Sequence, residues 1–189
     1  MKNIWTVVYD LHEGATNELE LDNPIDYTNE KLIYGGDNID LVNGRSKIVK
    51  LYQEKIDLIK SLLGDRFISG NHEAQGDSDH IYIIPNTRTG VMHGDYIFWG
   101  KEKSDKYRLK KHGAGFLKRF FWVNALEALE NGYDRKVTTE DLERFYEYCI
   151  RKNVDRIIAG HRHPSEHLEI DYKGKRLTVC RRGLTELEI

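Results

Sequence analysis

Short apolar segments alternate with polar, glycine-containing turns along this chain. The segments Ile4–Tyr9, Lys31–Tyr34 and Arg66–Ser69 contain β-branched and aromatic side chains and neither glycine nor proline. Such runs predict strands, and Ile4–Tyr9 is apolar enough to be covered on both faces. Similar runs predict further strands in the middle of the chain, at His80–Ile84, Thr89–Met92 and 155–159.

Other segments repeat apolar residues at the spacing of a helix. This spacing predicts a helix over about 45–63, which Gly64 is expected to end. A second helix is predicted to start at Thr138 or Thr139 and to run to about Lys152. The reason is that a threonine followed closely by acidic residues is a helix-capping signature.

The C-terminal part of the chain predicts a β-hairpin and one more strand. Glu166–Tyr172 and Arg176–Cys180 alternate in polarity around the turn 173–175, and Leu184–Ile189 is expected to be an edge strand. Together these elements predict an α/β fold of two packed, mostly mixed β-sheets flanked by helices. We expect a single domain over residues 1–189, with a helical insertion at about 100–153.

The insertion contains the most strongly charged segment of the chain. Residues 101–119 include eight basic and two acidic side chains, a net charge of +6. The overlapping segment 116–129 predicts a helix with a wide apolar surface. Two interpretations stay open: helices packed on a sheet with a solvated basic loop, or a basic, aromatic cap that holds an anionic substrate. The aromatic residues of 116–123 also leave partner binding open.

Composition limits the classes of protein to which the chain can belong. A length of 189 residues is enough for one core without disulfides, and a formal net charge of −2 excludes a chain that is basic or acidic throughout. Cys149 and Cys180 are expected to be ordinary buried thiols in a reducing compartment. The six-residue run before Asp10 is too short for a membrane span or a signal peptide, so we predict a cytoplasmic protein.

Five of the predicted strands end in clusters of residues that can bind metal ions. Alternate side chains of an extended or turning backbone point the same way, so Asp10 and His12 can converge. Asp37 follows two glycines, and its carboxylate has two oxygens with which to bridge two cations. Any one cluster is also compatible with a solvated or structural turn. Five such clusters, each at the end of a predicted strand, favour a shared metal site over five unrelated turns. They lie at 10–12, 36–40, 70–73, 93–95 and 160–163.

The order of these clusters resembles the calcineurin-like metallophosphoesterase superfamily. The resemblance spans residues 10–163, and the intervals of 27, 34, 22 and 68 residues between positions 10, 37, 71, 93 and 161 leave room for a helix or loop at most steps. It implies a dinuclear metal site at the C-terminal ends of the strands. The implied ligands are Asp10, His12, Asp37 and His163 for one metal, and Asp37, Asn71, His93 and His161 for the other.

The resemblance also implies a reaction, in which a hydroxide that bridges the two metals breaks a P–O bond. The residue types agree independently, because carboxylate, amide and imidazole ligands without thiolate favour Mn²⁺, Fe or Zn²⁺ over Ca²⁺. We expect two divalent ions, Mn²⁺ before Fe or Zn²⁺. Two cations about 3.5–4 Å apart can clamp a phosphoryl group and lower the pKa of a water between them.

Other polar residues of the clusters receive supporting roles. In similar enzymes the histidine after the asparagine protonates the leaving group, so His72 and Asp37 are the predicted catalytic residues. The alternative for His72 is a histidine that only orients the ligands. Asp40 and Asp95 are expected to accept imidazole or amide hydrogen bonds, although an Asx turn is as good an interpretation of Asp40. Arg162 is expected to face solvent or to reach a substrate phosphate.

Departures from the family pattern bear on the substrate. Glu73 matches the protein Ser/Thr phosphatase branch, but the Val-Asp-Arg-Gly signature of that branch is missing after Asp37. His93-Gly94-Asp95 before a basic helical insertion is similar to the branch that cleaves the pyrophosphate of UDP-diacylglucosamine. We therefore expect hydrolysis of a phosphodiester or pyrophosphate bond in a small phosphorylated or nucleotide-like substrate. A phosphomonoesterase or protein phosphatase, a nuclease and a non-catalytic metal-binding scaffold remain alternatives, and the oligomeric state stays open.

Overall fold

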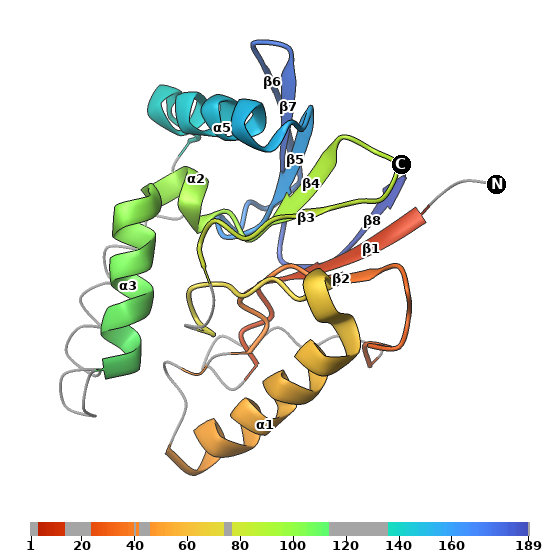
Figure 1. Ribbon diagram of the computed structural model, residues 1–189, viewed down its shortest axis with the longest axis vertical. Coiled ribbons are helices and arrows are strands. Elements are labelled where there is room, and N and C mark those ends of the chain that lie inside the picture. The colour runs from red at the N-terminus through yellow and green to blue at the C-terminus, as the bar shows by residue number, and fades with distance from the viewer. Residues whose placement is uncertain are drawn as a thin grey trace.

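The computed structural model describes residues 4–13, 24–39, 41, 46–73, 77–113 and 136–188, with 46–50 and 109–113 described by their backbone alone. Within these residues the chain forms two β-sheets with helices on their outer sides (Figure 1). This arrangement confirms the predicted α/β class with two packed sheets flanked by helices.

The smaller sheet has three strands, in the order β2-β1-β8. The central strand β1 (Ile4–Tyr9) pairs in parallel with β2 (Leu32–Tyr34) and antiparallel with β8 (Gly183–Glu188). The last strand of the chain therefore lies at a sheet edge, as predicted, and covers a flank of the first strand. Its alternating buried and exposed residues are those expected of a strand with one wet face.

The larger sheet has five strands, in the order β3-β4-β5-β7-β6. Its centre, formed by β4 (Thr89–Met92), β5 (Arg156–Ala159) and β7 (Lys175–Val179), is parallel. The edge strands β3 (Tyr82–Ile83) and β6 (Leu168–Tyr172) run antiparallel to their neighbours, which makes the sheet mixed, as predicted.

The core between the sheets is built by alternate residues of the central strands. Trp5, Val7 and Tyr9 of β1 face Val91 and Ile158 of the larger sheet in one buried apolar cluster. The intervening residue Val8 points to the other side, where it packs with residues of α1. Because side chains alternate between the two faces of a strand, a strand that is buried on both faces has to be apolar throughout.

The outer faces of the two sheets are covered by helices. The helix α1 (Ser46–Leu63), followed by a short 3₁₀ turn, η1 (Gly64–Arg66), covers the smaller sheet. The helices α2 (Asp95–Trp99) and α5 (Thr139–Lys152) pack on the larger sheet (Figure 1). The predicted capping signature of α5 is confirmed, because Thr138 and Asp141 exchange side-chain to backbone hydrogen bonds.

Two strand predictions need correction. Arg66–Ser69 is not a strand: its pairing with a strand is one isolated bridge, between Phe67 and Tyr34, in which Ile68 N donates to Tyr34 O at 2.8 Å. The reason is that β2 ends at Tyr34, so little extended backbone is left for the segment to pair with. His80–Ile84 contributes only two residues to β3, since it lies at the sheet edge and pairs with β4 alone.

The structure corrects one of the two interpretations of the basic segment 101–119, the one with a solvated basic loop. Its first part is not a loop but a helix, α3 (Lys101–Gly113), separated from α2 by Gly100 with a φ of +79°. The predicted helix 116–129 and the aromatic residues 116–123 lie outside the described residues. None of the helices in the described part of the chain is long and apolar enough to cross a membrane. Cys149 and Cys180 are buried free thiols, as expected.

Candidate metal centre

The polar clusters meet at one edge of the sandwich, where the two sheets touch. β1 and β2 run in parallel, as do β4 and β5, so the carboxyl ends of each pair lie at one edge. Tyr9 at the end of β1 reaches across to the other sheet, and its hydroxyl lies 3.0 Å from the carbonyl oxygens of Met92 and Ile158. This contact holds the ends of the two strand pairs together.

Glycines allow the clusters to approach one another closely. A Cβ on Gly70 would lie 2.0 Å from Asp37 Oδ1, and a Cβ on Gly160 would lie 2.7 Å from Asp10 Oδ2. Neither position can accept a side chain without displacing a carboxylate. The glycines of the motifs are therefore required by the packing of the predicted ligands.

Unusual backbone conformations are concentrated at the same place. Eight described residues other than glycine have a positive φ. This region is unfavourable for most side chains, although aspartate, asparagine and histidine tolerate it better than others. Five of the eight are predicted metal ligands: Asp10 (57°), His12 (54°), Asp37 (54°), His161 (71°) and His163 (44°).

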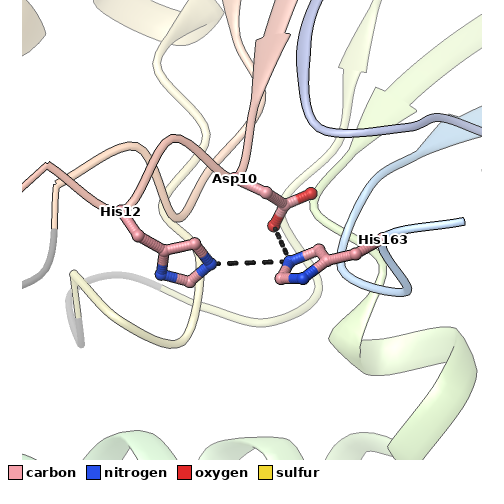
Figure 2. Close-up of side chains that lie close together, drawn as sticks. All are labelled: Asp10, His12 and His163. Carbon is pink, nitrogen blue, oxygen red and sulfur yellow. Dashed lines mark hydrogen bonds and ion pairs between the residues drawn. The ribbon is translucent and has the colours of Figure 1, made fainter. Parts of the chain in front are cut away.

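The first predicted ligand group contains Asp10, His12 and His163 (Figure 2). His163 Nε2 lies 3.2 Å from Asp10 Oδ1 and 3.5 Å from His12 Nε2. The other oxygen of Asp10 accepts a hydrogen bond from the backbone N–H of His161, at 3.0 Å, which fixes the carboxylate between two turns. Three potential ligands from the ends of β1 and β5 thus point toward one another.

The second predicted group is arranged around His93. Its Nε2 atom lies 3.2 Å from Asp37 Oδ2, 3.0 Å from Asn71 Oδ1 and 3.1 Å from His161 Nδ1. One imidazole nitrogen carries at most one proton and cannot satisfy three such neighbours at once. Ligands about 2.0–2.2 Å from an ion lie near 3 Å from one another, so these spacings fit a shared cation.

Asp37 connects the two groups. Among the described residues, three sets of carboxylates and imidazoles have ligand atoms close enough to share an ion. Asp37 belongs to two of them, one with His93 and His161 and one with His12 and His72. His72 Nε2 lies 4.0 Å from Asp37 Oδ2, and the His72 ring packs edge-on against His12 at a centroid distance of 4.5 Å. The structure thus brings the predicted proton donor to the predicted bridging carboxylate.

The buried carboxylates and imidazoles shift one another's pKa values. Burial opposes ionisation of Asp37, but its histidine neighbours, His93 first, lower its pKa well below the ordinary value. Burial alone would lower the pKa of His93, but the Asp37 carboxylate raises it to about 9. Burial opposes ionisation of Asp10 as well, but His163 and His93 together lower its pKa. Both aspartates are therefore ionised at neutral pH.

Two other imidazoles are held in the neutral state. Burial and the neighbouring His72 lower the pKa of His12 to about 3. Burial and the neighbouring His93 lower the pKa of His161 well below its ordinary value. Neutral imidazoles and ionised carboxylates are the forms that bind metal ions, so Asp10, Asp37, His12 and His161 are in the form that ligates. His93, whose pKa is raised by Asp37, would release a proton on binding a cation.

Glu73 is a structural part of the site whose role the sequence analysis did not identify. Its buried carboxylate accepts hydrogen bonds from the backbone N–H groups of Asp37, Asn38 and Gly70, at 2.7–2.8 Å, and from the hydroxyl of Tyr34. Burial and the nearby Asp37 raise the pKa of Glu73 to about 7. The only sequence signal was its position two residues after Asn71.

Two further residues hold the turns that carry the ligands. Asn38 donates to Val8 O and accepts from Leu11 N, which joins the turns after β1 and β2. Arg182 donates to the backbone carbonyls of Asp10 and Leu11. Neither contact could be predicted from spacing, since Arg182 lies more than 170 positions from its acceptors.

Asp95 differs from its expected role. It was predicted to accept hydrogen bonds from imidazole or amide groups, but its carboxylate instead binds the guanidinium of Arg108, with contacts of 2.9–3.1 Å. Arg108 also donates to Ser69 O. Both charged groups are almost completely buried, so this ion pair joins α2 and α3 to the turn that precedes Asn71.

Arg162 does not face solvent, which corrects one of its two expected placements. Its guanidinium pairs with Asp141 at 3.2 Å and lies 4.7 Å from the ring centroid of Phe98, and only 13% of the side chain is exposed. Contact with a substrate phosphate stays a prediction. Asp40, the other predicted supporting residue, lies outside the described residues.

No protein-family model matches the chain, and no curated protein matches it in sequence. Among solved structures the chain is similar to Vacuolar Protein Sorting 29 from Cryptosporidium parvum, with 14% sequence identity and a TM-score of 0.45. The match covers 99% of this chain and 86% of that one. We therefore interpret the site from its own geometry.

Proposed function

We propose that this protein is a metal-dependent phosphoesterase that hydrolyses a phosphodiester or pyrophosphate bond. The observation that carries the proposal is the position of Asp37 at a buried edge of the sandwich, where it lies within ligand distance of His93 and His161 of one group and of His12 of the other. A single structural metal would need only one such group. Two groups joined by one carboxylate are the arrangement that places two cations beside the same phosphate.

Each predicted ligand has a specific part in the proposed site. Asp10, His12 and His163 would hold one ion, Asn71, His93 and His161 would hold the other, and Asp37 would contact both. Two divalent ions supply positive charge for the phosphate oxygens and lower the pKa of a bound water. Ligands of this type, without thiolate, favour Mn²⁺, with Fe or Zn²⁺ as alternatives.

His72 is the proposed proton donor to the leaving group. Its Nε2 lies 4.0 Å from the proposed bridging carboxylate, and its ring is largely buried, so it can lie beside the reacting phosphate. Imidazole is the side chain suited to general acid catalysis near neutral pH, where it can donate a proton as the leaving group forms. The geometry also supports a second role, as a ligand with His12 and Asp37.

The proposed substrate is a small phosphorylated or nucleotide-like molecule in the cytoplasm. A nucleic acid substrate is a second candidate that the basic helix α3 favours, because lysines track a phosphate backbone. A phosphomonoester is the other competing substrate class. Comparing the rates at which the protein hydrolyses these classes of substrate tests the proposal.

The first experiment measures hydrolysis of bis(p-nitrophenyl) phosphate and p-nitrophenyl phosphate with Mn²⁺. We expect faster cleavage of the diester, and a loss of at least about 100-fold in kcat for Asp37→Asn and His161→Ala, since each removes a ligand. Asp171→Asn and His167→Ala are matched controls, because both residues are exposed and lie outside the ligand groups. They should keep wild-type rates.

The outcomes separate the alternatives. Faster monoester cleavage would indicate a phosphomonoesterase, and cleavage of oligonucleotides in preference to both esters would indicate a nuclease. Metal binding by the wild-type protein, measured by calorimetry, without hydrolysis of any phosphate ester or pyrophosphate would leave the metal-binding scaffold. For His72→Asn, a lower kcat with unchanged metal affinity would support proton donation. A parallel loss of metal affinity would show that His72 is a ligand.

A further inference from the structure

A cavity of about 410 Å³ lies between α2, α3 and α5, outside the ligand groups. Its lining includes Trp99 at the end of α2, the glycine that separates α2 from α3, and the first two turns of α3. From the other side it is bounded by Glu140 and Arg144 of α5. The cavity is open to solvent and has room for a small chemical group.

Trp99 connects this cavity to the candidate metal centre. Its indole packs edge to face against the ring of His161, with the centroids 4.4 Å apart. Tyr107 of α3 packs on the same indole at 5.2 Å, which fixes its orientation. Trp99 therefore contacts both the cavity and a predicted metal ligand.

The charge of the cavity is mostly positive, with four cationic and two anionic side chains in its lining. Arg144 is occupied by Glu140 and Asp141, and Lys101 is paired with carboxylates of Asp77 and Asp105. The remaining cations are Lys103 and Lys106 of α3. Glu102, at the rim, is exposed and offsets part of their charge.

Lys103 and Lys106 lie three positions apart and so share one face of α3. Neither forms an ion pair with a carboxylate in the described part of the chain, and the Lys103 ammonium lies 5.2 Å from the ring centroid of Trp99. Lysine is a common phosphate ligand, which it binds as a point charge. These two ammonium groups are the cations of the cavity that are available to an anion.

We propose that this cavity binds a second phosphate group of the substrate, distinct from the one that is hydrolysed, through Lys103 and Lys106. The inference rests on the proposed function, and it narrows the substrate to small molecules with two phosphate groups separated by a short spacer. The spacer is short because Trp99 both lines the cavity and contacts His161. Substrates with one phosphate would be hydrolysed without this contact.

A pair of esters with the same scissile bond tests the proposal. Thymidine 5′-(p-nitrophenyl phosphate) is compared with its 3′-phosphorylated form, using the full chain with Mn²⁺. We expect the 3′-phosphate to raise kcat/KM at least fivefold in the wild type, and Lys103→Gln/Lys106→Gln to abolish this gain while leaving the other ester within twofold. Lys31→Gln/Lys60→Gln is the matched control, because it removes the same charge from two exposed lysines, one just before β2 and one in α1.

A binding experiment separates failure of this inference from failure of the proposed activity. Thymidine 3′,5′-bisphosphate is titrated calorimetrically into the full chain in EDTA, where hydrolysis plays no part. We expect a Kd at least tenfold weaker for Lys103→Gln/Lys106→Gln than for wild type, and a difference that shrinks as salt is added. Weaker binding of the bisphosphate by Lys103→Gln/Lys106→Gln, without hydrolysis of either ester by the wild type, would support phosphate binding in the cavity. It would count against the proposed phosphoesterase activity.

Two results would overturn the inference. One is equal binding of the bisphosphate, and an equal 3′-phosphate effect, in the wild type and in Lys103→Gln/Lys106→Gln. The other is a loss of affinity for single-stranded oligonucleotides but not for the bisphosphate, which would make these lysines part of a nucleic acid surface instead.

Discussion

At the scale of single residues, the candidate site consists of polar side chains held in backbone conformations that are rarely adopted. Asp10 and Asp37 have positive φ angles and are completely or almost completely buried. Such conformations persist only where surrounding contacts stabilise them. For the turn at Asp37 these contacts come from Glu73, whose carboxylate accepts several backbone hydrogen bonds.

The first prediction concerns Glu73. Glu73→Ala leaves buried N–H groups of Asp37, Asn38 and Gly70 without an acceptor, and each such group costs about 1–3 kcal/mol. We therefore expect the free energy of unfolding, measured in urea, to fall by about 3 kcal/mol or more. Glu166→Ala, at an exposed loop position, should change it by less than about 0.5 kcal/mol. Equal stability of the two variants would contradict this account of the turn.

At the scale of elements, α2 and α3 are joined to the site by one buried ion pair. α2 begins directly after the predicted ligand His93, and Arg108 of α3 binds Asp95 in the first turn of α2 as well as Ser69 O. Arg108 therefore fixes α3 relative to the turns that carry His93 and Asn71. This position keeps the cavity beside Trp99 next to the candidate metal centre.

The second prediction concerns this ion pair. Arg108→Met leaves the Asp95 carboxylate buried without its counterion, and breaking a buried pair in this way costs about 3–5 kcal/mol. Thermal and urea unfolding should both show the loss. Arg176→Met is the control: it also removes an arginine from an ion pair, but that side chain is 51% exposed, so we expect a change below about 1 kcal/mol. A similar effect of both substitutions would refute a special role for Arg108.

At the scale of the whole molecule, the predicted ligands come from both sheets. Asp10 and Asp37 follow β1 and β2 of the smaller sheet, whereas His93 and His161 follow β4 and β5 of the larger one. In the second ligand group, Asp37 of one sheet lies 3.2 Å from His93 of the other. A cation held by both would link the two sheets at their shared edge.

The third prediction follows from that link. Mn²⁺ at 100 times its Kd should stabilise the fold by about 2.7 kcal/mol per site, which raises the Tm of a chain of this length by about 5–10 °C. EDTA should reverse the shift, and Asp37→Asn should remove most of it, whereas Asp171→Asn should respond to Mn²⁺ like the wild type. A Tm that does not depend on Mn²⁺ in the wild type would exclude a metal-linked pair of sheets.

Several features of the molecule follow from short-range sequence pattern. The apolar run of β1, the helical repeat of α1, the capping signature of α5 and the glycines beside the clusters are local signals, and the structure confirms each of them. The order of the clusters also identified residues that converge in space. This was possible because parallel strands bring their carboxyl ends to one edge, so residues at equivalent positions meet whatever lies between them.

Only the tertiary structure decided which long-range partners the polar residues have. The pairing of Glu73 with the Asp37 turn, of Arg108 with Asp95 and of Arg162 with Asp141 joins residues from different elements, and no local periodicity encodes such contacts. The same holds for Arg66–Ser69, which was predicted to be a strand. It is not a strand, because too little extended backbone lies beside it for pairing. The sequence by itself determined most of the helices and strands and the types of polar side chain at the strand ends, because propensity and turn chemistry act over a few residues. The packing of the two sheets determined the contacts that orient these polar side chains.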